Sequence, residues 1–129
     1  MNNKHLYSAY QRVKSNCCDE WKNSSSFYAW YKCQVAKQDN LCCYCHLPGD
    51  TKDYYGRHFR PREDKKGGVD YLRGHYLEVE RKDNNQPYSP DNCVLACYPC
   101  NNAKSDVFSY EEFKEIGKAI AQVKTGFKV

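Results

Sequence analysis

The sequence predicts an α+β fold in which helical segments at both ends flank a small central pair of short strands. Residues 75–81 alternate apolar and polar side chains, as a strand does, and residues 93–97 form a second short apolar run. Apolar residues recur at helical spacing near both ends. The chain has 129 residues, which suits one domain with a modest core. Its mean hydropathy of -0.95 indicates that this core needs another source of stability.

Helices are predicted around residues 6–13 and 27–39, where aromatic and aliphatic side chains share one face. A third helix is predicted to begin at Ser109, because Ser109 and Glu112 have the spacing of a capping box. It should end near Gly126.

The two predicted strands are joined by residues 82–92, which are dense in turn-forming residues and predict a loop. Leu77 and Val79 are the expected inward pair of the first strand. Pro99 can occupy the first turn of a helix that follows the second strand. Residues 50–74 read as a basic loop, and two interpretations stay open there: a solvated insertion, or a segment that contacts phosphate.

The net charge is +4, which favours an acidic partner over a basic one without identifying it. No run of eighteen apolar residues predicts a membrane span. The first ten residues lack an apolar signal region, so we expect a cytoplasmic, reducing location. In that setting the nine cysteines indicate metal ligands or free thiols rather than disulfides.

Two C-x-x-C turns stand about fifty residues apart. A two-residue gap lets both sulfurs of one turn reach one metal ion, and two such turns supply the four thiolates of a structural zinc site. The predicted zinc ligands are Cys42, Cys45, Cys97 and Cys100.

Alternatives remain for this quartet. Cys43 could replace Cys42, His46 could substitute for a thiolate, or all four could be free, buried cysteines. The remaining cysteines have no C-x-x-C partner and are expected to be ordinary half-buried thiols: Cys17, Cys18, Cys33 and Cys93.

Polar residues with possible chemistry surround the second turn. Glu80 ends the first strand, Asn92 lies in the return turn, and Asn101 directly follows the last predicted zinc ligand. A carboxylate and an amide oxygen facing each other can hold one hard divalent cation. Taken singly, each of these residues also fits an ordinary surface or turn position.

Residues 41–106 resemble the HNH, or His-Me finger, endonuclease motif, which runs strand, loop, strand, helix around two C-x-x-C turns. The matching segments are LEVER, the Asp91–Asn92 turn, VLAC and CNNAKSD. The resemblance implies a zinc-stapled ββα-metal core, preceded by a helical part over 1–40 and followed by a helix over 107–129, within one domain. It also implies that Glu80 and Asn101 bind a catalytic Mg²⁺ or Mn²⁺ ion, and that Asn92 holds the loop.

Arg81 stands where the family has its general-base histidine. Arginine stays protonated at physiological pH and does not accept a proton. His75, His58 or a metal-bound hydroxide could serve as the base instead, and Arg81 could stabilise the charge that develops on phosphate.

The resemblance therefore implies a metal-dependent endonuclease that hydrolyses DNA phosphodiester bonds. Glu80, Arg81, Asn92 and Asn101 are its expected catalytic residues, and Arg81, Lys82 and Lys104 its expected substrate contacts. The alternative is a zinc-binding module that binds nucleic acid, DNA or RNA, with weak catalysis or none. A third reading is a zinc-stapled protein–protein adaptor.

Overall fold

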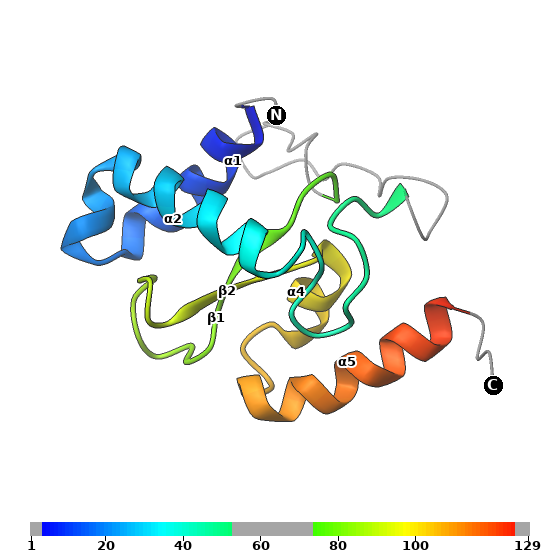
Figure 1. Cartoon of the computed structure of the whole chain (residues 1–129). Helices are drawn as coiled ribbons and strands as arrows, with labels where there is room; N and C mark the ends of the chain where they lie inside the picture. Colours follow the sequence, from blue (N-terminus) through cyan, green and yellow to red (C-terminus); the bar gives the residue numbers. More distant parts are fainter. Residues whose placement is uncertain (1–3, 53–73, 126–129) are drawn as a thin grey trace, which may run out of the picture.

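The computed structural model describes residues 4–52 and 74–125 of the chain. Two helices, α1 (Lys4–Val13) and α2 (Ser24–Lys37), precede an antiparallel hairpin of β1 (Glu78–Arg81) and β2 (Cys93–Ala96). The helices α4 (Tyr98–Lys104) and α5 (Tyr110–Lys124) follow it. Short 3₁₀ turns over Lys14–Asn16 and Asp19–Lys22 join α1 to α2. In Figure 1, α1 and α2 lie to one side of the hairpin and α5 to the other. The predicted α+β class is confirmed.

The N-terminal helices begin and end where local chemistry requires. The side chain of Asn23 accepts a hydrogen bond from the Ser25 backbone N–H and so caps α2. Asp39 and Asn40 follow the helix with positive φ angles of 53° and 57°, a conformation that ends helical hydrogen bonding. The predicted fading of this helix near residue 39 is confirmed.

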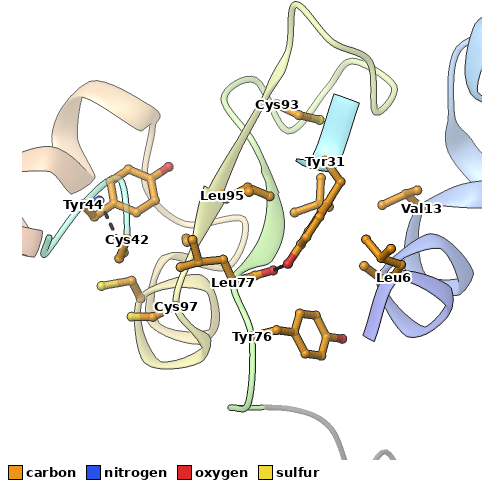
Figure 2. Packing of buried hydrophobic residues seen from close by; sticks show 14 of the residues in the cluster. Leu6, Val13, Tyr31, Cys42, Tyr44, Tyr76, Leu77, Cys93, Leu95 and Cys97 are labelled. Atoms are coloured by element: carbon orange, nitrogen blue, oxygen red, sulfur yellow. Dashed lines mark hydrogen bonds between the residues drawn. The ribbon is translucent and has the colours of Figure 1, made fainter. Parts of the chain in front are cut away.

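Two side chains of the α2 region fasten the helix to the hairpin. The hydroxyl of Tyr31 donates to the carbonyl of Leu77 at 2.6 Å, just before β1 (Figure 2). The amide of Gln38 forms a two-way bond with Leu95 of β2: its Nε2 donates to the Leu95 carbonyl, and its Oε1 accepts from the Leu95 N–H. A side chain thus pairs the outer edge of β2 at Leu95, whose carbonyl also accepts from the Cys43 backbone N–H.

The strand β1 is shorter than the sequence predicted, and both of its faces are buried. Leu77 and Val79 are buried as expected, but Glu78 and Glu80 are buried as well, at 1% and 5% exposure. The sequence pattern predicted a half-exposed strand. The difference arises because α4 covers the face that carries the two carboxylates, as the side-chain contacts below show.

The last helix, α5, begins with the predicted capping box. Ser109 Oγ accepts from the Glu112 N–H, and the Glu112 carboxylate accepts from the Ser109 N–H. Phe113 is fully buried and its ring meets that of Tyr44 edge to face, with centroids 5.0 Å apart. Gly117 also lies against the Tyr44 backbone, so the helix approaches the first cysteine turn closely.

Replacing Gly117 by alanine tests that approach. A Cβ at this position would lie 2.5 Å from the Tyr44 carbonyl oxygen, which is backbone and cannot easily move. Helix propensity alone favours alanine by about 1 kcal/mol, but overpacking costs about 1–3 kcal/mol. We expect Gly117→Ala to lower the free energy of unfolding, as measured by denaturant titration. The exposed Gln122→Ala should change it little, and a stabilised Gly117→Ala would contradict the packing described.

Candidate metal centre and the face between β1 and α4

The structure brings the four predicted zinc ligands together. The Sγ atoms of Cys42, Cys45, Cys97 and Cys100 all lie within 4.8 Å of one another, and all four residues are buried. The Cys45 and Cys97 sulfurs are 3.7 Å apart. A tetrahedron of thiolates at about 2.3 Å from zinc places its sulfurs roughly 3.8 Å apart. The donor set and its spacing therefore fit a structural zinc ion.

The local chain explains how this cluster forms. Cys42 and Cys45 belong to a tight turn after α2, in which the His46 N–H donates to the Cys42 carbonyl and His46 has a φ of 60°. Cys97 is the residue before α4, and Cys100 lies in its first turn after Pro99, as predicted. In Figure 2, Cys42 and Cys97 lie beside each other at the end of the hydrophobic core.

Crowding of the thiols affects how they ionise. Burial opposes ionisation of Cys42, but hydrogen bonds from the thiols around it lower its pKa. The hydrogen bond between Cys42 and Cys100 lowers the pKa of Cys42 and raises the pKa of Cys100. Burial of four thiols at this spacing is the environment in which a bound cation would stabilise the thiolate form.

The same geometry decides against the alternative ligands Cys43 and His46, while metal analysis tests whether the four thiols are free. Cys43 is outside the cluster, and its backbone N–H donates to Leu95 of β2. His46 is exposed and outside it too. Of the cysteines expected to be half-buried, Cys17 and Cys18 are so, whereas Cys33 is exposed and Cys93 is buried.

We expect elemental analysis to find about one zinc ion per chain. Cys97→Ser should lose most of it, since a serine hydroxyl replaces a thiolate in a four-sulfur site. Cys33→Ser is the matched control because Cys33 is exposed and outside the cluster. Equal zinc content in Cys97→Ser and the wild type would contradict the assignment.

Directly beside the cluster, two carboxylates of β1 meet two side chains of α4. The Asn101 Nδ2 donates to Glu78 Oε1 at 2.8 Å, and the Lys104 Nζ donates to Glu80 Oε1 at 3.2 Å. Asn101 was expected to face Glu80, whereas in the structure its amide is bonded to Glu78. Glu78 was not among the expected site residues. Strand alternation was the signal that could have found it, because residues 78 and 80 share one face.

The carboxylate of Glu80 is only half satisfied. Its Oε1 accepts from Lys104, whereas the buried Oε2 has no hydrogen-bond partner among the described residues. Burial raises the pKa of Glu80 to about 7, against the attraction of the Lys104 ammonium. A buried acceptor without a donor is costly, and such an oxygen fits a cation-binding role.

Arg81 and Asn92 shape the loop between the strands. The Arg81 guanidinium lies 4.8 Å from the centre of the Tyr88 ring and donates to the Gln86 carbonyl at 3.2 Å. Asn92 accepts from the Asp83 N–H through Oδ1, and its Nδ2 donates to loop carbonyls, those of Asp83, Gln86 and Pro87. Arg81 is half-buried and next to solvent, in a position from which it could meet a ligand.

Two hollows border this face. One, of about 420 Å³, is lined by Glu78 and Asn101 together with Arg12 of α1. The other, of about 630 Å³, is lined by Arg81, Lys82 and the start of α5. Arg12 was not among the expected site residues, because it lies far outside the motif. No local pattern brings α1 to this position; packing of α1 on β1 does.

The remaining expected residues fall in different places. Lys82 is half-buried, with its ammonium 5.5 Å from the centre of the Tyr110 ring. Lys104 was expected to contact a phosphate. Its side chain is 0% exposed, so it does not extend to where a phosphate would bind. His75 is half-buried just before β1, and His58 lies outside the described residues.

The chain is similar to the rare-cutting HNH restriction endonuclease PacI, with a TM-score of 0.63 and 27% identity over 96% of this chain and 77% of that one. No family model matches the chain, and no curated protein does. The hairpin, α4 and the four-cysteine cluster give the chain an α+β fold of the HNH-like, ββα-metal kind, similar to that of this endonuclease. Within residues 4–52 and 74–125, no helix is both long and apolar enough to cross a membrane.

Proposed function

We propose that this protein is a metal-dependent endonuclease that hydrolyses phosphodiester bonds in DNA. The observation that supports it most is the buried, half-satisfied Glu80 carboxylate facing α4, on a fold similar to that of an HNH restriction endonuclease. A net charge of +4 is compatible with a polyanionic substrate.

The residues present fit a hard divalent cation. Glu80 would hold it through Oε2, which has no other partner among the described residues, and Asn101 through Oδ1. The bond from Asn101 Nδ2 to Glu78 orients that amide, as a group behind a metal ligand does. When bound, Mg²⁺ or Mn²⁺ would neutralise charge on the scissile phosphate and the leaving oxygen.

Arg81 and Lys82 are the proposed substrate contacts. Both lie at the hollow beside the β1–β2 loop, and a guanidinium suits the charge that develops on phosphate. Asn92 holds the loop that carries them. Because Arg81 cannot accept a proton, the base would be His75, His58 or a hydroxide on the bound metal ion.

A second candidate function rests on the same arginine. An HNH fold whose general-base position holds Arg81 could bind nucleic acid, DNA or RNA, without cutting it. Such a module would show salt-sensitive binding that does not depend on Mg²⁺.

A plasmid-nicking assay with Mg²⁺ or Mn²⁺ separates the two functions. We expect the wild type to nick, and we expect Glu80→Gln and Asn101→Ala to lose activity by at least about 10- to 100-fold, the loss seen when even an orienting group is removed. Glutamine is preferred at position 80 because it keeps an acceptor for Lys104.

Glu115→Gln is the matched control, since Glu115 is an exposed glutamate of α5 that pairs with Lys118 and is outside the proposed site. It should nick as the wild type does. A wild type that binds DNA but never nicks it, with either metal, would favour the binding module over the nuclease.

A further inference from the structure

The buried lysine of α4 has a role that its sequence position does not reveal. The Lys104 ammonium donates to Glu80 Oε1 at 3.2 Å, to the Arg81 carbonyl at 3.3 Å and to Asn84 Oδ1 at 3.2 Å. An ammonium group has three N–H donors, and here each has an acceptor. A lysine with 0% exposure is rare unless it is paired in this way.

These three acceptors lie together at one point of the fold. They come from the last two residues of β1 and from the third residue beyond it, so Lys104 ties the end of α4 to the end of β1 and the start of the loop. The far end of the loop is tied back to this start, because the Lys82 N–H donates to the Asn92 carbonyl and the Asn92 side chain binds the backbone of Asp83.

The contact with Glu80 also sets the direction of that carboxylate. One oxygen is committed to the ammonium, which leaves Oε2 as the oxygen without a partner. Without Lys104, nothing else among the described residues would fix which oxygen faces the cation site. The Lys104 ammonium also binds the Arg81 carbonyl, and so it fixes the backbone from which the Arg81 side chain extends.

We propose that Lys104 is a positioning residue, whose ammonium orients Glu80 toward a bound divalent cation and fixes Arg81 without contacting DNA itself. This inference rests on the proposed function for its consequence in catalysis. It replaces the sequence-based expectation that Lys104 contacts a phosphate.

A phosphate contact and a positioning role differ in salt dependence. Removing one phosphate contact lowers the slope of log affinity against log salt by about 1. We therefore expect Lys104→Met to keep the wild-type slope for DNA binding measured by fluorescence anisotropy without divalent metal, and Lys82→Met to lower it. A slope lowered by about 1 in Lys104→Met would overturn the proposal.

A positioning role and a purely stabilising role for Lys104 predict different effects of its substitution on the affinity for a divalent metal ion. For zinc-loaded protein below its melting temperature, we expect Lys104→Met to weaken Mn²⁺ binding, measured calorimetrically without DNA, by about 10-fold or more. The kcat for nicking should fall with it while KM stays near the wild-type value. Unchanged or tighter Mn²⁺ binding would overturn the proposal.

Two further variants keep the test decisive. Asn84→Ala removes only one acceptor of the ammonium, so it should shift Mn²⁺ binding and kcat in the same direction by a smaller factor even if Lys104→Met does not fold. An Asn84→Ala protein identical to the wild type in both measurements would count against the proposal. Lys118→Met, which removes an exposed lysine of α5, is the control and should change neither.

These experiments distinguish failure of the positioning role of Lys104 from failure of the proposed nuclease function. If the wild type does not nick but Lys104→Met and Asn84→Ala both weaken Mn²⁺ binding, the nuclease fails and the positioning role stands. If the wild type nicks and both variants match it, the positioning role fails and the nuclease stands.

Discussion

The convergence of four cysteine sulfurs is the constraint on which the rest of this structure depends. The two turns that carry them are far apart in the chain, and the second has little local support: α4 has seven residues, and no side chain caps its start. A helix of that length is not stable alone in water. A metal ion shared by both turns would join them at a fixed distance and contribute folding energy directly.

The position of α4 then determines the chemistry beside it. Cys100 is followed at once by Asn101, so holding the sulfur holds the amide next to Glu78. One turn later Lys104 meets Glu80. The pairs form because β1 presents every second residue to the helix, and the helix presents residues three apart to the strand. A buried carboxylate with a buried ammonium is costly to break, so this face should behave as one unit.

Much of this arrangement could be predicted from residues close together in the chain. The C-x-x-C spacing gave the zinc quartet, the pair Ser109 and Glu112 gave the start of α5, and the turn-forming run gave the loop between the strands. What local patterns could not give was which residue of α4 faces which residue of β1. That depends on how α4 is rotated about its own axis when it packs on β1, and no residue close to α4 in the sequence determines this rotation.

Long-range contacts were unpredictable for the same reason. Gln38 pairs the edge of β2 from 57 residues away, and Arg12 reaches the hollow beside Asn101 because α1 packs on the hairpin. Lys104 was expected to contact the substrate, which would require an exposed ammonium. Its burial follows from three acceptors that only the folded chain brings together.

The side-chain amide of Asn101 reports on the central claim most directly, because it lies one residue beyond a cluster sulfur and is bonded across to Glu78. Nuclear magnetic resonance of isotope-labelled protein during stepwise removal of zinc by a chelator would follow that amide and the β1–β2 backbone together. If the cluster positions α4 against β1, the Asn101 amide and hairpin signals should lose their folded positions in proportion to the zinc removed. If they persist unchanged after all the metal has gone, the sulfur cluster does not hold this face together.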